Sequence, residues 1–140
     1  MGKDRRRKGS RFLQGYPLPE IGEGYRRVVL SVPCPLPEPL IDAVEYHTST
    51  EEAILPLDGD IAMAFAPATP AGSVPLEKMK AYRIPRGTMV ILKAGAWHSG
   101  PYVIGSKAVH ILVALPERTY ANDCVVKKLS GTERLKITGT

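Results

Sequence analysis

Two stretches of the chain decide its expected fold, EYHTSTEEAILPLDG at residues 45–59 and GTMVILKAGAWH at residues 87–98. Their candidate metal ligands are Glu45, His47, Glu52 and His98. Imidazole and carboxylate groups supply neutral nitrogen and anionic oxygen without soft sulfur, a combination that suits divalent Zn, Mn, Fe or Ni. We therefore expect these side chains to bind one divalent metal ion, whose identity the pattern leaves open.

The same stretches have the pattern of strands joined by turns. Side chains alternate between the two faces of a strand, so Glu45 and His47 should project to one side. Glu52 follows a short turn, and His98 follows a second turn at Gly95. Closing these two hairpins against each other in a barrel would bring the ligands to one interior point and leave a coordination position for water or substrate.

The remaining sequence favours short strands over helices. Thirteen Pro and thirteen Gly interrupt the 140 residues, and the runs between them have the composition of strands. The expected strands are 26–32, 43–47, 53–57, 61–66, 80–84, 89–92, 109–115 and 124–129. The turn at Asp58-Gly59-Asp60 is expected to need a positive φ at Gly59. Many short strands with frequent turns predict an all-β sandwich or barrel.

The spacing of the ligands and glycines resembles the two motifs of the cupin superfamily. The frame is present with three departures: Glu45 stands where the first motif has its first histidine, Lys93 where the second has proline, and Tyr102 where it has asparagine. The resemblance implies an all-β, cupin-type double-stranded β-helix, which is a jelly-roll barrel. The departures leave open a cupin that binds a small acid or sugar without turnover.

Further sequence elements accompany the ligands between residues 45 and 129. They are Leu55-Pro56-Leu57, Gly59-Asp60, Ala64-x-Ala66-Pro67-Ala68, Tyr82-Arg83-Ile84-Pro85-x-Gly87-Thr88, Gly95-x-Trp97-His98 and Pro116-Glu117-Arg118-Thr119-Tyr120-Ala121-Asn122-Asp123-Cys124. These elements resemble the ureidoglycolate lyase family, also called ureidoglycolate hydrolase. The resemblance implies a metal-dependent enzyme that cleaves ureidoglycolate, a small carboxylate, to glyoxylate and urea. Another cupin enzyme, such as a sugar isomerase or a dioxygenase, is an alternative.

The lyase hypothesis assigns roles to four further residues. Arg83 or Lys93 is expected to bind the substrate carboxylate through charge-assisted hydrogen bonds. Tyr102 or His110 is expected to transfer protons. Structural alternatives are a solvated turn lysine for Lys93, a rim aromatic for Tyr102, and a core histidine bonded to a backbone carbonyl for His110. For His110, on an apolar strand, we favour a position in the barrel cavity.

The net charge of +5 is concentrated at the start of the chain. Residues 1–11 hold six basic side chains and one acidic side chain, which also gives +5, so the rest of the chain is nearly neutral. A basic arm without interleaved aromatics is expected to be a solvated tail and not a nucleic-acid-binding element. We expect a flexible arm at 1–23, a barrel at 24–129 and a tail at 130–140, with the proline-rich residues 33–39 as an extended connector.

Cysteine use, hydropathy and strand edges indicate the compartment and the assembly. Cys34 and Cys124 lie far apart without CxxC spacing, which favours a reducing compartment. No apolar run reaches the length of a bilayer span, so we expect a cytoplasmic protein without a membrane partner. The strand expected at 26–32 has an apolar centre and could cover an open sheet edge by pairing with a second subunit. We therefore expect a homodimer that binds a small-molecule carboxylate.

Overall fold

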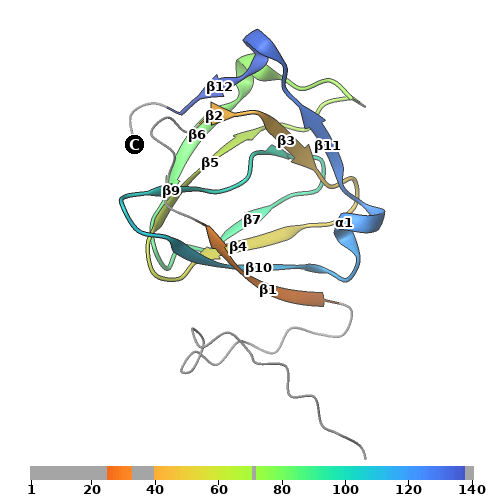
Figure 1. Ribbon diagram of the computed structural model, residues 1–140. Helices are drawn as coiled ribbons and strands as arrows, with labels where there is room; N and C mark the ends of the chain where they lie inside the picture. Colours follow the sequence, from red (N-terminus) through yellow and green to blue (C-terminus); the bar gives the residue numbers. More distant parts are fainter. Residues whose placement is uncertain (1–24, 33–39, 71, 138–140) are drawn as a thin grey trace, which may run out of the picture.

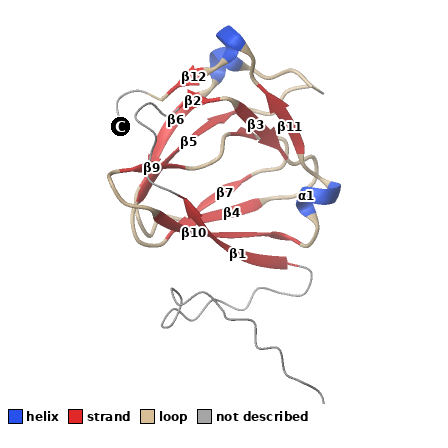
Figure 2. Cartoon of the chain, viewed as in Figure 1, coloured by secondary structure: helices blue, strands red, loops and turns tan. Residues whose placement is uncertain are grey.

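The computed structural model describes residues 25–32, 40–70 and 72–137. Most of the regular structure in this part is antiparallel strand, and two large sheets face each other (Figure 1, Figure 2). No helix in the described residues is long and apolar enough to cross a membrane. The arm expected at 1–23 and the proline-rich connector expected at 33–39 lie outside the described residues.

The expected strands are all present in the structure. The strands are β1 (Tyr25–Val32), β2 (Leu40–Ile41), β3 (Ala43–Tyr46), β4 (Glu52–Pro56), β5 (Asp60–Ala66), β6 (Lys80–Ile84), β7 (Val90–Leu92), β8 (Trp97–His98), β9 (Tyr102–Ile104), β10 (Val109–Pro116), β11 (Val125–Lys128) and β12 (Leu135–Lys136). The helical elements are η2 (Leu76–Lys78), α1 (Thr119–Asn122) and η3 (Gly131–Glu133). The ends of the expected strands differ from the observed ends by at most one residue. The strands that were not expected, β2, β8, β9 and β12, have only two or three residues each, too few to show an alternating pattern.

The strand order defines two large sheets. One has four strands in the order β1-β10-β4-β7, and the other has β11-β3-β8-β5-β6 with β9 also paired to β5. In Figure 1 the four-stranded sheet lies below the larger sheet, and α1 connects β10 of the first to β11 of the second. The consecutive strands β3 and β4 belong to different sheets, so the turn between them crosses from one sheet to the other. This antiparallel two-sheet architecture confirms the expected all-β jelly-roll barrel.

The main core fills the space between the two sheets. Alternate residues of β10 supply one wall of it, and Val109, Ile111, Val113 and Leu115 are 0–4% exposed. Met63 of β5 packs into the same cluster from the larger sheet. The core residues of β10 alternate with a period of two, as expected for a strand that packs one face on the core. Apolar side chains from both sheets therefore fill the interior of the barrel.

A second core covers the outer face of the larger sheet. Ala62 and Ala64 of β5 point to this side, where they pack with Trp97, which is 1% exposed. Ile41 of β2 and Ile137, directly after β12, belong to the same cluster. β12 pairs with β2 in a separate two-stranded sheet. The segment expected as a tail therefore contains a strand and a buried side chain that pack on the barrel.

Gly59 corrects one expectation about the turn between β4 and β5. Its φ is not positive, unlike those of Gly87 and Gly95, which are +80° and +81°. A Cβ at Gly59 would lie 2.5 Å from Cγ2 of Val109, far inside a normal contact distance. The position requires glycine because β10 passes close by, and not because of its backbone conformation.

Candidate metal centre

Four potential metal ligands converge between the two sheets. Glu45 comes from β3, His47 from the residue directly after β3, Glu52 from the start of β4, and His98 from β8. One ligand atom of each lies within 4.8 Å of the others. The histidines and Glu52 are 2–3% exposed, and Glu45 is partly exposed. The structure thus brings together all the ligands that the two sequence stretches indicated.

Strand pairing explains why these side chains meet. Glu45 and His98 are directly opposite each other in the β3–β8 pair, so they project from the same face of the larger sheet. Glu52 begins β4 in the opposite sheet, and it is buried on the same face of β4 as the core residue Ile54. The crossing from β3 to β4 therefore places candidate ligands from one strand–turn–strand segment on both walls of the barrel.

Backbone carbonyls orient both histidine rings. Nδ1 of His47 donates a hydrogen bond to the carbonyl of Asp123 over 2.7 Å, and Nδ1 of His98 donates one to the carbonyl of Ala96 over 3.1 Å. A carbonyl only accepts, so each Nδ1 carries a proton and each Nε2 is turned towards the carboxylates. Metal-binding histidines commonly have this arrangement, in which a hydrogen bond holds one ring nitrogen and the other faces the ion.

The Nε2 atoms and the carboxylates form a compact set of donor atoms. Nε2 of His47 lies 3.1 Å from Oε2 of Glu52. Nε2 of His98 lies 3.4 Å from Oε1 of Glu45 and 3.4 Å from Oε2 of Glu52, yet it is buried without a hydrogen bond of acceptable geometry. A buried ring nitrogen between two carboxylates fits a divalent ion, because the ion would satisfy all of these atoms at once.

In the metal-free protein the same groups balance their charges as ion pairs. The hydrogen bond with Glu52 raises the pKa of His47. Burial disfavours the charged form of His98, but the carboxylates of Glu45 and Glu52, each 3.4 Å from Nε2, outweigh it and raise the pKa of His98 to about 9. Burial likewise opposes ionisation of Glu52, while the hydrogen bond with His47 and the nearby ring of His98 lower its pKa to about 2. Imidazolium protons thus neutralise the carboxylates, and a divalent cation could replace those protons at the same net charge.

The carboxylate of Asp123 holds the turn between His47 and Glu52. It accepts hydrogen bonds from the N–H of Thr48 over 2.6 Å and from the N–H and hydroxyl of Ser49 over 3.0 and 2.9 Å. Burial opposes ionisation of this carboxyl, but the hydrogen bonds hold the pKa of Asp123 well below its usual range. Because its carbonyl also orients the ring of His47, Asp123 positions both this candidate ligand and the turn that follows.

A small cavity of about 40 Å³ adjoins the cluster. Its lining includes the apolar residues Ile54, Met63, Ile111 and Val113 and the polar residues Glu45, Glu52, His98, Ser99 and Tyr120. A cavity of this size accommodates about one or two water molecules but no organic substrate. Entry of a substrate therefore requires a side chain at the edge of the cavity to move.

Tyr120 and Cys124 lie beside the cluster, although the sequence did not indicate them as site residues. Tyr120 of α1 packs edge-on against His47, with ring centroids 6.2 Å apart. Burial and the neighbouring carboxylates raise the pKa of Tyr120, so it keeps its phenolic proton. The thiol of Cys124 donates to Oε2 of Glu45 over 3.4 Å. Both belong to residues 116–124, one of the elements that resemble the ureidoglycolate lyase family. That resemblance is the sequence feature that could have indicated them as site residues.

The two residues expected to bind the substrate carboxylate lie away from the cluster. Nε of Arg83 donates to Asp60 over 2.9 Å, and the Arg83 side chain is 63% exposed. Nζ of Lys93 donates to Glu51 over 2.6 Å, and the Lys93 side chain is 75% exposed. Arg83 is also opposite Ala62, which faces the outer core. These cations therefore pair with neighbouring surface carboxylates and do not line the cavity.

The two residues expected to transfer protons are also placed elsewhere. Nδ1 of His110 lies 2.5 Å from Oδ2 of Asp58. Its neighbour Ile111 lines the cavity, so His110 faces the opposite side of β10, and its expected cavity position is wrong. Tyr102 packs against the outer core, and its hydroxyl donates to the carbonyl of Leu40 over 3.4 Å. On a strand that is apolar on both faces, the sequence does not show which face is inside.

The chain matches no protein-family model and no curated protein. It is similar to the structure of Co(II) HppE in complex with Tris buffer, at 13% identity and a TM-score of 0.46, over 66% of this chain and 45% of that chain. It is similar to hydroxypropylphosphonic acid epoxidase from S. wedmorenis, at 16% identity and a TM-score of 0.46, over 66% of this chain and 43% of that chain.

A third similar structure is protein NMB1881 from Neisseria meningitidis. The identity is 13% and the TM-score is 0.44, over 70% of this chain and 79% of that chain. The matched region is less than half of the length of the HppE and epoxidase structures.

Proposed function

We propose that this protein is a metal-dependent enzyme that acts on a small carboxylate, and that its reaction is the cleavage of ureidoglycolate to glyoxylate and urea. One observation is the main support for metal binding. Nε2 of His98 is buried between two carboxylates without a hydrogen bond, while its Nδ1 donates to a backbone carbonyl. The residues that would hold Zn, Mn, Fe or Ni are Glu45, His47, Glu52 and His98. The sequence elements between residues 45 and 129 that resemble the ureidoglycolate lyase family support the choice of reaction.

The residues around the cavity supply the groups that the cleavage needs. A bound divalent ion would polarise a chelated carboxylate and hydroxyl and lower the pKa of that hydroxyl. The cleavage moves the hydroxyl proton to a base, forms the C=O of glyoxylate and breaks the C–N bond, whose electron pair leaves with the urea nitrogen.

Glu45 and Tyr120 are the residues best placed for the two proton transfers. The side chain of Glu45 is 26% exposed, whereas those of His98 and Glu52 are 3% and 4% exposed, so the Glu45 oxygen that does not hold the metal is the most accessible base. Tyr120 lines the same cavity and keeps its proton, so it would protonate the departing nitrogen. These residues take the roles that the sequence had suggested for Tyr102 and His110.

A metal-binding protein without turnover is the second candidate. The observation that favours it is the volume of the cavity, about 40 Å³, because small-molecule sites usually measure about 300–1,000 Å³. An enzyme would have to open this cavity. Tyr120 is the side chain best placed to move, since it sits at the cavity on α1, a helix of only four residues.

Release of glyoxylate from racemic ureidoglycolate tests the proposal. The protein is stripped with a chelator, reloaded separately with Zn, Mn, Fe or Ni, and compared with the spontaneous rate. Tyr120→Phe should keep its metal and lose about 10²-fold or more of the rate, as expected for a lost proton donor. The matched variant Tyr102→Phe should retain the full rate. Release no faster than the spontaneous rate with every ion, from a protein that binds stoichiometric metal, would overturn the lyase in favour of the second candidate.

A further inference from the structure

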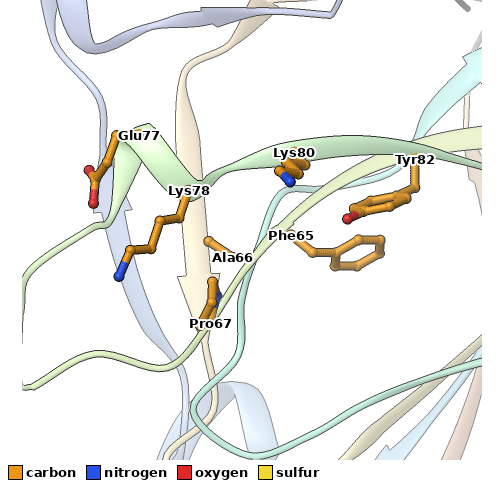
Figure 3. A pocket seen from close by; sticks show the side chains of 7 residues that line it. All are labelled: Phe65, Ala66, Pro67, Glu77, Lys78, Lys80 and Tyr82. Atoms are coloured by element: carbon orange, nitrogen blue, oxygen red, sulfur yellow. The ribbon is translucent and has the colours of Figure 1, made fainter.

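An open groove of about 580 Å³ lies at the β5–β6 edge of the larger sheet (Figure 3). Its lining includes Phe65, Pro67, Glu77, Lys78, Lys80 and Tyr82. This volume is in the range of small-molecule sites, roughly 300–1,000 Å³. The groove is therefore large enough for an organic ligand, which the cavity of about 40 Å³ at the cluster is not.

The apolar part of the groove is an aromatic surface formed by Phe65 and Tyr82. Their ring centroids are 6.0 Å apart, and the ring planes are inclined by 38°. In Figure 3 the two rings lie next to each other, and their side chains extend towards each other from neighbouring strands. Tyr82 is 52% exposed, so one face of this surface is open to solvent. A planar group can stack on such a surface.

The polar part of the groove carries an excess of positive charge. Lys78 and Lys80 supply two ammonium groups, against the single carboxylate of Glu77. Among the described residues neither lysine forms a salt bridge, whereas Arg83 and Lys93 each pair with a carboxylate. An ammonium group without a carboxylate partner, beside an apolar surface, suits the charge-assisted binding of an organic anion.

Strand register places the groove next to the metal cluster. Phe65 lies opposite His98 in the β5–β8 pair and opposite Lys80 in the β5–β6 pair. His98, Phe65 and Lys80 therefore form one row on one face of the sheet. Neighbouring strands are about 4.8 Å apart, so the row from His98 to Lys80 spans about 10 Å. A ligand that lies over Phe65 would extend from the lysine towards the cluster.

We propose that this groove binds a small organic anion, with its carboxylate at Lys80 and its planar, unsaturated body on Phe65 and Tyr82. Lys78 adds a second cation at the rim of the groove. This binding depends on the groove alone and does not require the proposed metal-dependent function. The class consists of aryl carboxylates such as benzoate. Ureidoglycolate lies outside it, because its single carboxylate would be chelated by the metal, and His98 and Lys80 are about 10 Å apart along the row.

Titration of the chelated, metal-free protein with benzoate tests the groove directly. Backbone amide shifts locate the ligand, and the shifts expected to move are those of Phe65, Lys80 and Tyr82. Benzamide has the same shape without the charge and should bind at least about fivefold more weakly. Acetate has the charge without the ring and should also bind more weakly than benzoate. Equal binding of benzoate and benzamide, or shifts confined to other strands, would overturn the proposal.

Two matched variants test the residues. Lys80→Gln should weaken benzoate binding at least about fivefold, because it removes the cation without removing the stem. Lys93→Gln removes an exposed lysine that is already paired with Glu51, and should leave the affinity unchanged. Tyr82→Leu should weaken benzoate more than acetate. Unchanged affinity in Lys80→Gln, or an equal loss in Lys93→Gln, contradicts the assignment. A short oligothymidylate that binds the groove with higher affinity would displace benzoate. That result would overturn the organic anion as the ligand and assign the groove to single-stranded nucleic acid.

The same measurements separate this proposal from the proposed function. Benzoate binding in a protein that takes up no metal would support the groove and overturn the metal-dependent enzyme. Metal-dependent release of glyoxylate without benzoate binding would support the enzyme and overturn the groove. If both proposals are correct, Lys80→Gln should weaken benzoate binding and leave the metal content unchanged.

Discussion

The backbone N–H of Gly95 donates a hydrogen bond to the carbonyl of His47 over 2.6 Å, and so ties the two ligand-bearing stretches together. His47 is held on both sides, because Asp123 accepts the hydrogen bond from its ring. The turn that contains Gly95 leads directly into β8 and His98. A displacement of this turn would therefore move ligands on both stretches.

Gly95→Ala should destabilise the fold and weaken metal binding. Its φ is +81°, and a Cβ there would lie 2.9 Å from Cβ of Ala68. Gly87→Ala is the matched control, because its φ is +80° and nothing lies within 4 Å of the added Cβ. A left-handed backbone with a side chain costs about 1–2 kcal/mol at either position. Denaturant unfolding should show the larger loss for Gly95→Ala, and metal titration should show a lower affinity in this variant alone. Equal effects in both variants would contradict the role of Gly95.

His98→Ala should lower the metal content of the purified protein at least about tenfold, because one ligand is lost from an open site. His110→Ala is the matched control, since this histidine contacts Asp58 on the outside of β10. Elemental analysis measures the metal content, and circular dichroism checks that both variants fold. Unchanged metal content in His98→Ala, or an equal loss of metal in His110→Ala, would contradict the assignment of His98 as a ligand.

Homodimer formation stays a prediction, and the edge of the four-stranded sheet is where we expect it. β1 pairs with β10, and among the described strands it has no neighbour on its other side. Its sequence is YRRVVLSV, with an apolar centre. An unpaired edge of this kind favours pairing with a second copy. Light scattering should give the mass of a dimer at micromolar concentration, and a monomer mass would count against the prediction.

The longer strands and the spacing of the candidate ligands within each stretch could be predicted because they depend on local pattern. The alternation along β10 and the spacing between Glu45 and Glu52 are visible within a few residues. The cation partners could not be predicted, because the pairing of Arg83 with Asp60 depends on the register of two strands. Tyr120 also escaped prediction, since its place beside the cluster depends on how α1 packs after β10.

Gly59→Ala should destabilise the protein by about 1–3 kcal/mol, the usual cost of overpacking. The added Cβ would lie 2.5 Å from Cγ2 of Val109, which is 3% exposed and cannot move into solvent. Val109→Ala removes this contact atom, so the double variant should lose less stability than the sum of the two single variants. Urea unfolding of all three variants measures the coupling. Additive losses would show that the close approach is not why Gly59 is needed.

The metal-free protein should have a stability maximum in mildly acidic solution. The pKa of Glu52 falls from 4.5 to about 2 on folding, so its stabilising contribution is present above pH 4.5 and is lost as the pH falls towards 2. The pKa of His98 rises from 6.5 to about 9, so its contribution is complete below pH 6.5 and is lost as the pH rises towards 9. The free energy of unfolding should therefore be highest between pH 4.5 and 6.5.

Metal should abolish the alkaline part of this dependence. In the loaded protein the ion would keep His98 in its neutral form, so raising the pH would not remove a proton that stabilises the fold. Urea unfolding of the chelated and the loaded protein at several values between about pH 5 and 9 makes the comparison. The chelated variant His98→Gln isolates the residue and should show a smaller alkaline decline than the chelated parent protein. A parent protein that keeps its stability up to pH 9 without metal would show that His98 gains no proton on folding.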